Sequence, residues 1–88
     1  MEGQRLILND GTIIEDGSAG YADEFLWLYL QGYSMTQAAF LFLNADKTWK
    51  IVYQYGDMEK TYEGFTVCTY IQMDDENTLS VCMKRADR

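Results

Sequence analysis

The sequence predicts an α+β domain with an N-terminal β-hairpin, a helical hairpin and then a four-stranded antiparallel meander, the helices being packed on one sheet face (ββααββββ). Three observations predict this class. An Asp-Gly pair separates two aliphatic runs, two short apolar segments between residues 22 and 43 carry helix-capping residues, and apolar side chains alternate along residues 48–84. A chain of 88 residues is the size of one domain, so we expect a single domain over residues 1–88.

The first expected element is a hairpin made of strands 5–9 and 12–15. An Asp-Gly pair between apolar runs favours a two-residue type I′ turn, because both turn positions need positive φ. With that turn, Leu8 faces Ile13 across the hairpin. The glycines and serine of residues 17–20 are expected to form a flexible connector.

Two short helices are expected next. The first spans about residues 22–31, with acidic residues in its first turn and Gly32 as its left-handed cap. The second spans about residues 35–43, and Ser34 and Gln37 before and within it fit a capping box. Helices this short are not stable alone, so tertiary packing must hold them.

The meander begins with a hairpin over residues 48–65. A three-residue loop pairs Trp49 with Phe65, and Gly64 indicates a bend or bulge beside that pair. The strands are expected to turn one face toward the helices. The residues expected on that core face are Trp49, Ile51, Tyr53, Phe65, Val67, Ile71, Val81 and Met83.

The last hairpin is expected to join strands 66–73 and 78–84. Its apolar residues are odd-numbered, and residues that face each other across a hairpin share a side of the sheet. The register that follows pairs Ile71 with Leu79 and places Cys68 directly opposite Cys82, on the face away from the core.

The charge balance limits the classes of function. Seven basic residues against fourteen acidic ones give a formal net charge of −7. Direct nucleic-acid binding is not expected, because phosphate contacts need Lys and Arg. The negative charge also argues against binding to an anionic membrane surface. No apolar run approaches the roughly 20 residues of a membrane span. The N-terminus does not resemble a signal peptide, so we expect a cytoplasmic protein.

Catalytic chemistry is not expected either. The chain has no histidine, which removes the commonest general base and the Ser-His and Cys-His nucleophile pairs. The acidic run at residues 74–76 lies in an expected turn, where solvated carboxylates are ordinary. Neither a phosphate-binding glycine loop nor an EF-hand spacing is present. We expect no catalytic residue, no cofactor and no metal site.

Cys68 and Cys82 allow two interpretations. Opposite each other on one face, they could act as a redox pair or as half of a metal site. Their spacing matches no CxxC pattern, and no histidine is present to complete a zinc site. A reducing cytoplasm favours the other interpretation, two reduced thiols that act as small apolar side chains.

The apolar residues of the two expected helices point all around each helix axis. A helix on one sheet face buries a stripe, so the rest of this surface needs another cover. That cover is either the domain's own core or a partner protein, since aromatic residues are enriched in interface cores. The candidate interface residues are Phe25, Trp27, Tyr29, Phe40 and Phe42.

Four segments carry a resemblance to known proteins. They are KIVYQYGDME at residues 50–59 with YEGFT at 62–66, LILNDGTIIEDG at 6–17, and FLWLYLQGY at 25–33. In these segments the chain resembles small proteins encoded on prophages and conjugative elements of Gram-positive gut bacteria. The resemblance covers most of the chain. It implies a cytoplasmic accessory protein of a mobile element and transfers no catalytic residue.

These features together predict a non-enzymatic protein-interaction module. Its partner is another protein or a second copy of the chain, which would form a homodimer through the helix aromatics. The alternative is an acidic inhibitor or nucleic-acid mimic that targets a basic host protein. A small-ligand or metal-binding domain is a third class.

Overall fold

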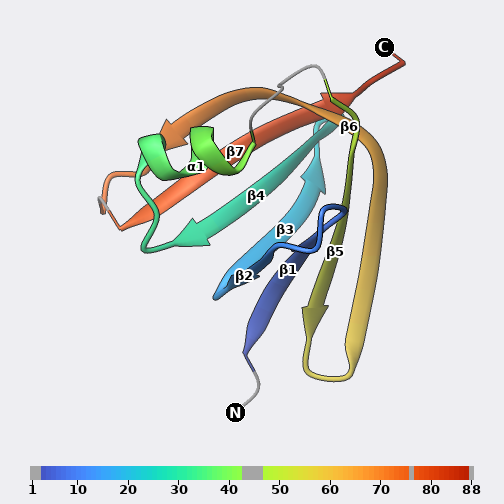
Figure 1. Cartoon of the computed structure of the whole chain (residues 1–88), viewed down its shortest axis with the longest axis horizontal. Helices are drawn as coiled ribbons and strands as arrows, with labels where there is room; N and C mark the ends of the chain where they lie inside the picture. Colours follow the sequence, from blue (N-terminus) through green and yellow to red (C-terminus); the bar gives the residue numbers. More distant parts are fainter. Residues whose placement is uncertain (1–2, 43–46, 76, 88) are drawn as a thin grey trace.

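The computed structural model describes residues 3–42, 47–75 and 77–87. These residues form one seven-stranded sheet and one short helix (Figure 1). All neighbouring strands are antiparallel, in the order β2-β1-β5-β6-β7-β4-β3. The elements are β1 (Gln4–Leu8), β2 (Ile13–Glu15), β3 (Gly17–Ala22), β4 (Phe25–Gln31), α1 (Met35–Leu41), β5 (Trp49–Tyr55), β6 (Met58–Gln72) and β7 (Thr78–Arg85).

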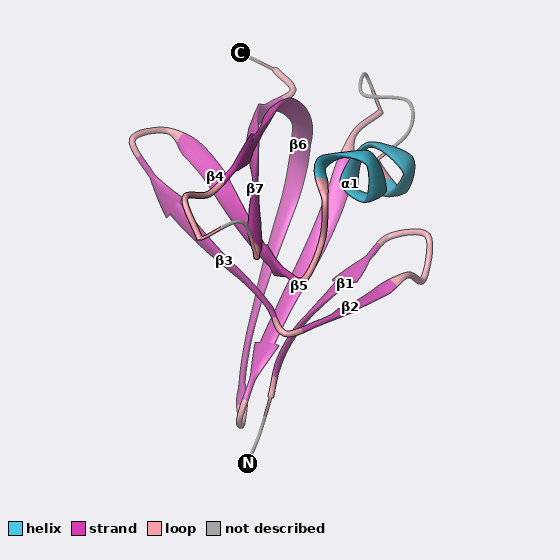
Figure 2. Ribbon diagram, turned by 90° about the vertical axis from the view of Figure 1, so that its left-hand side faces the viewer, coloured by secondary structure: helices cyan, strands magenta, loops and turns pink. Residues whose placement is uncertain are grey.

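The sheet curls because its two edge strands are consecutive in the chain. Only Asp16, with φ +57°, separates β2 from β3, so the two edges meet at this corner and diverge from it as a V (Figure 2). At the corner, a Cβ atom on Gly17 would lie 3.0 Å from Cδ1 of Leu6. A larger residue at this position would be crowded unless the Leu6 side chain shifted by a few tenths of an ångström, so glycine favours this close approach of the two edges.

The hydrophobic core lies on the concave side of the curled sheet. Helix α1 lies on the same side, between the two halves of the V, and contacts β6 and β7 (Figure 2). The ring of Phe42, directly after α1, packs edge-on against Trp49 of β5 with centroids 5.0 Å apart. The buried cluster comprises Leu6, Leu8, Ile14, Leu26, Leu28, Leu30, Ala38, Phe42, Trp49, Ile51, Phe65, Leu79, Val81 and Met83.

The predicted α+β class with a helical hairpin is wrong, because the described chain is mostly β and has a single short helix. Residues 22–31, predicted as the first helix, end β3 and form β4. The predicted connector at residues 17–20 is part of the edge strand β3. Gly32 does have positive φ, +79°, but it follows a strand instead of capping a helix.

The reason for this error lies in the alternation along β4. The leucines at positions 26, 28 and 30 are fully buried, and the aromatic residues between them point outward and are half-buried. Both faces of the strand are thus apolar, which hides the period of two that normally indicates a strand. The apolar residues predicted to lie all around a helix axis belong instead to a strand with one aliphatic face and one aromatic face.

The second predicted helix exists and is α1. Ser34 Oγ accepts a hydrogen bond from the Gln37 backbone N–H, and Gln37 Oε1 accepts one from the Ser34 N–H, which confirms the capping box. The helix ends at Leu41, and its predicted end at residue 43 lies outside the described residues. Within the described parts of the chain, no helix is long and apolar enough to cross a membrane.

The N-terminal hairpin forms, but with a longer turn than the sequence predicts. Four residues join β1 to β2, and Ile7 instead of Leu8 faces Ile13. Asp10 causes the change, because its Oδ1 accepts a hydrogen bond from the Thr12 N–H and stabilises the wider turn. In this register Leu8 and Ile13 no longer face each other and lie on opposite sides of the hairpin. Leu8 is buried, and Ile13 is 48% exposed.

Strand β6 is one continuous, bent strand, where the sequence predicts two strands that meet between residues 65 and 66 (Figure 1). Its first half pairs with β5 and its second half with β7. The bend falls at Gly64, whose φ is +84°, and the register shifts there so that Trp49 faces Phe65. The predicted bulge at Gly64 and the predicted pair of aromatic residues are both confirmed.

A second bulge, at Cys68, overturns the predicted register of the last hairpin. Val67 faces Met83 as expected, but Thr69 faces Cys82, and Ile71 then faces Ser80 instead of Leu79. An extra residue in one strand moves every later side chain to the opposite face. Ile71, predicted in the core, is therefore 43% exposed.

The turn between β6 and β7 depends on one carboxylate. Asp75 accepts hydrogen bonds from the backbone N–H groups of Asn77 and Thr78 and from Thr78 Oγ1. The backbone hydrogen bond from Asn77, followed by the side-chain bond from Thr78, lowers the pKa of Asp75 below its ordinary value of 3.8. Because the folded-state pKa is lowered, this stabilisation is present above pH 3.8 and is lost as the pH falls through the folded-state pKa.

We therefore expect Asp75→Asn to lower the stability at neutral pH. The difference between wild type and variant should begin to shrink near pH 4 and vanish as the pH falls through the lowered folded-state pKa of Asp75, below which both side chains are neutral. Urea denaturation at a series of pH values measures it. The control is Asp74→Asn, which removes the same charge without those hydrogen bonds. A difference that stays constant down to pH 2 would contradict this role of Asp75.

Candidate functional site

One side of α1 is an apolar surface that the described parts of the chain leave uncovered. Ala38 and Phe42, one turn apart, both point into the core and are at most 1% exposed. Phe40 lies between them in the sequence and therefore points away from the core, with 74% of its surface exposed. No other large hydrophobic side chain in the described parts of the chain is as exposed.

A hollow of about 380 Å³ lies beside Phe40. Its lining is apolar almost throughout, and we call it, together with the Phe40 ring, the helix surface. The residues of the helix surface are Tyr33, Thr36, Gln37, Phe40 and Leu41.

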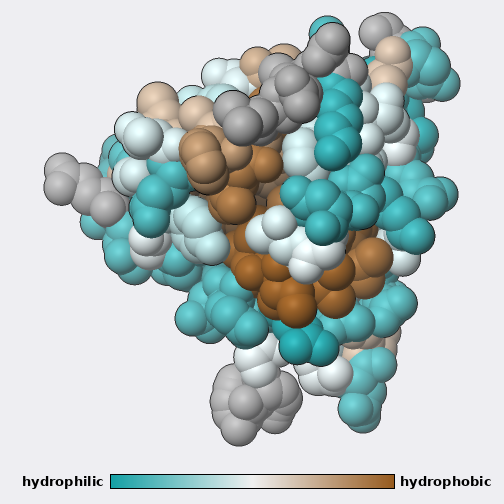
Figure 3. All heavy atoms as spheres, in the orientation of Figure 1, coloured by the Kyte–Doolittle hydropathy of each residue, from teal (hydrophilic) through white to brown (hydrophobic). Residues whose placement is uncertain are grey.

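The helix surface is uncharged. No acidic or basic residue occurs from Met35 to Leu41, in a chain whose formal net charge is −7. Figure 3 shows hydrophobic residues gathered over α1 and, next to it, over the β1–β2 hairpin. On that hairpin, Ile13 is exposed and Ile7 is half-buried. The apolar area therefore extends beyond the helix itself.

A second apolar feature lies on the convex side of the sheet. Phe25, Trp27 and Tyr29 of β4 point outward as the outer row, and the rings of Phe25 and Trp27 have centroids 6.2 Å apart. Their partners in β7 include Ser80 and Cys82, which are only 2% and 4% exposed although they lie on the same outer side. The outer row thus lies beside small side chains that it helps to shield from water.

The five aromatic residues predicted as one interface are divided among three places. Phe25, Trp27 and Tyr29 lie together on the convex side of β4, Phe40 is exposed on α1, and Phe42 is buried in the core. Only Phe40 lies on a helix and faces solvent.

The two cysteines lie across the bulge on the convex side. Cys68 is exposed, and Cys82 is buried. Burial, followed by the neighbouring Cys68 thiol, raises the pKa of the Cys82 thiol above its ordinary value of 9.0. Cys82 is therefore protonated at neutral pH.

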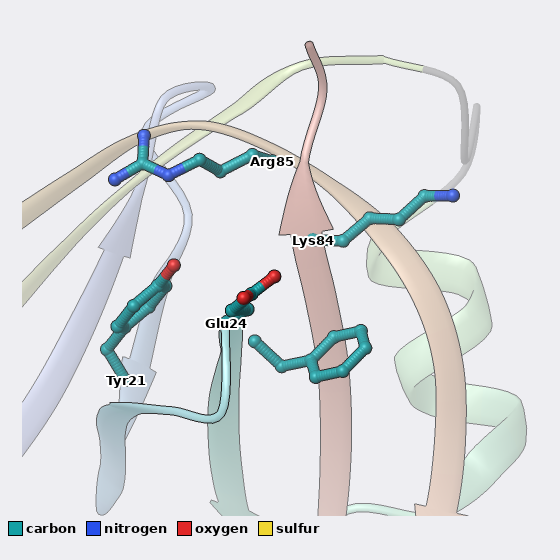
Figure 4. Close-up of a pocket in the computed structure, with 5 residues that line it drawn as sticks. Tyr21, Glu24, Lys84 and Arg85 are labelled. Atoms are coloured by element: carbon teal, nitrogen blue, oxygen red, sulfur yellow. The ribbon is translucent and has the colours of Figure 1, made fainter. Parts of the chain in front are cut away.

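A small pocket of about 190 Å³ opens beside the turn between β3 and β4 (Figure 4). The Arg85 guanidinium lies over the ring of Phe65 at 5.3 Å and over that of Tyr21 at 5.9 Å. Both signs of charge occur in the lining, so the pocket is neither a plain anion site nor a plain cation site. The lining residues are Tyr21, Glu24, Phe25, Lys84 and Arg85.

No protein-family model, curated protein or solved structure matches this chain. In the described parts of the chain, no group of three or more His, Cys, Asp or Glu side chains is placed to hold a metal ion.

The turn beside the pocket is strained. Asp23 and Glu24 are its two central residues, and their φ values are +54° and +70°. A two-residue hairpin turn of type I′ needs this left-handed conformation at both positions, and glycine adopts it without a steric penalty whereas other residues adopt it at a cost of about 1 kcal/mol or more.

We expect Asp23→Gly to raise the free energy of unfolding by about 0.5 kcal/mol, because relief of the left-handed strain outweighs the greater freedom of the unfolded chain. Urea denaturation measures the change. The control is Asp57→Gly in the β5–β6 turn, where φ is not left-handed. That substitution removes the same charge and should lower stability. Equal effects at the two positions would contradict the assignment of strain to Asp23.

Sequence reasoning missed Tyr33 and Leu41 as parts of the helix surface. Their role depends on the direction in which α1 faces, and the core contacts of Ala38 and Phe42 decide that direction. One available signal was the absence of charge from α1, which is unusual for a helix side that faces water. The pocket beside the β3–β4 turn combines residues from two distant segments, and no local pattern indicates it.

Proposed function

We propose that this chain is a non-enzymatic protein-interaction module that associates with a second copy of itself through the helix surface. The observation that carries the proposal is the Phe40 ring, 74% exposed beside an apolar hollow on the same helix. Large exposed apolar areas on soluble proteins mark interaction sites, and aromatic anchors in pockets dominate binding energy.

The shape of the helix surface supports a symmetric pair. A protruding ring and a hollow that can receive it lie side by side on one element. In a two-fold dimer each surface meets its own copy, so each Phe40 can enter the hollow of the other protomer beside Tyr33 and Leu41. One patch of residues then supplies both halves of the contact.

Electrostatics support the same site. Two copies that each carry a formal charge of −7 repel each other, and contact between acidic surfaces would add to this repulsion. The segment from Met35 to Leu41 carries no charge, so contact through α1 brings no acidic residue of the helix against its copy.

Sedimentation equilibrium of the full chain over a range of concentrations tests the proposal. The molar mass should rise from 10.2 kDa toward twice that value, and added salt should favour the rise by screening the repulsion. A chain that remains monomeric at every concentration, at both low and high salt, would refute self-association.

The effect of salt also distinguishes self-association from the alternative function, that of an acidic inhibitor or nucleic-acid mimic. An acidic inhibitor or nucleic-acid mimic would bind a basic protein through opposite charges, and added salt would weaken that binding. The helix surface would then be irrelevant to binding, and substitution of Phe40 would leave the complex unchanged.

A further inference from the structure

We propose that Cys68 and Cys82 are a reversible thiol pair that a hydroperoxide oxidises to an intramolecular disulfide. The pair joins β6 to β7 on the convex side of the sheet, whereas α1 lies on the concave side. The proposal therefore does not rest on self-association, and either one can fail without the other.

The bulge in β6 brings the two residues together. Val67 faces Met83 and Thr69 faces Cys82, so Cys68 is the extra residue and lies opposite Cys82. Val67 and Tyr70 pack against the core, which turns the side chain of Cys68 outward, the side on which Cys82 lies. Thr69 is the direct partner of Cys82, and in a bulge the extra residue, Cys68, opposes the same partner residue. Direct partners in antiparallel strands have Cα atoms about 4.5–5.5 Å apart, and a disulfide spans Cα separations up to about 6.8 Å, so a disulfide can span the separation at the bulge.

The two thiols differ in access. Cys68 is exposed, so a peroxide in solution can reach it. Cys82 is 4% exposed, and burial followed by the neighbouring Cys68 raises the pKa of its thiol, which disfavours direct reaction with reagents in water. This difference makes Cys68 the thiol that reacts with the peroxide first and Cys82 the thiol that then reacts with the oxidised Cys68.

The chemistry balances with one peroxide. The Cys68 thiolate attacks one peroxide oxygen, so that an S–O bond forms and the O–O bond breaks, and the released hydroxide takes a proton to become water. The Cys82 sulfur then attacks the sulfur of the Cys68 sulfenic acid. An S–S bond forms, the S–O bond breaks, and the hydroxide leaves as water with the proton of Cys82. Two thiols are oxidised and hydrogen peroxide is reduced to two molecules of water.

The test uses hydrogen peroxide on the folded chain, followed by alkylation of free thiols and digestion with trypsin. Both cysteines fall in one tryptic peptide, from Thr61 to Lys84, because no Lys or Arg lies between. We expect loss of both alkylation sites and a peptide lighter by two hydrogens. Dithiothreitol should restore both sites. The disulfide should form about tenfold faster or more in the folded chain than in urea, because the fold holds the sulfurs together.

Two variants distinguish the thiol that reacts with the peroxide from the thiol that then forms the disulfide. In Cys82→Ser, Cys68 should accumulate as a sulfenic acid that dimedone traps. In Cys68→Ser, Cys82 should stay reduced at the same peroxide concentration. Sulfinic acid on wild-type Cys68 with Cys82 still free, a disulfide between two chains, or equal rates in urea and in buffer would each overturn the proposal.

Discussion

Replacing Leu28 with lysine is expected to abolish folding. The Leu28 side chain is fully buried on the concave side of β4, and an unpaired ammonium there costs several kcal/mol, a large part of the 5–15 kcal/mol that stabilises a small domain. Trp27→Lys, one residue earlier, should leave a folded protein that is less stable by about 1–2 kcal/mol, because the lysine stem can lie along the outer side with its amine in water. Circular dichroism and the spread of amide chemical shifts measure both outcomes.

The same substitution at every position from 25 to 31 distinguishes a strand from a helix. A strand predicts that intolerance alternates, falling on the buried leucines at 26, 28 and 30. A helix would instead group positions three and four residues apart, so that Trp27 and Leu30 would respond alike. Intolerance with that spacing would refute the β4 assignment.

The second large effect is expected from Phe40→Gln. Burial of a Phe side chain contributes about 1.5–3 kcal/mol, and a symmetric dimer loses this twice. The dissociation constant should therefore rise between roughly a hundredfold and ten-thousandfold. The fold should remain, because the side chain is 74% exposed and glutamine favours helices. Sedimentation equilibrium measures the association, and urea denaturation checks the fold.

Met35→Gln is the matched control for this substitution. Met35 is on the same helix and is 46% exposed, but it does not line the hollow. Neither substitution changes the charge, so altered repulsion between the copies cannot explain a difference between them. Equal weakening by both variants would mean that the Phe40 ring has no special role in association.

Local signals predicted local structure well. The capping box at Ser34 and Gln37 depends only on residues three apart, and it forms as expected. The bulge at Gly64 was likewise indicated by a glycine within a strand pattern. The pair of Trp49 with Phe65 was correct although the turn is shorter than predicted, because the bulge offsets the missing turn residue.

The features that were predicted wrongly or missed depend on how segments distant in the sequence pack against one another. A strand buried on one side and aromatic on the other has no amphipathic pattern, so β4 could not be told from a helix without its neighbours β3 and β7. The bulge at Cys68 has no glycine to mark it, and it alone moved Ile71 out of the core. The helix surface was predicted only through Phe40, because its hollow exists only once α1 is docked.

The central claim is that Phe40 of one copy enters the hollow of another, and a half-labelled NMR sample tests it most directly. Equal amounts of ¹³C-labelled and unlabelled chain are mixed, and only nuclear Overhauser effects between the two kinds of chain are recorded. The account predicts contacts from the Phe40 ring to the Leu41 methyl groups and the Tyr33 ring. Contacts between chains that involve the Trp27 ring instead, or none in a sample whose mass is that of a dimer, would contradict it.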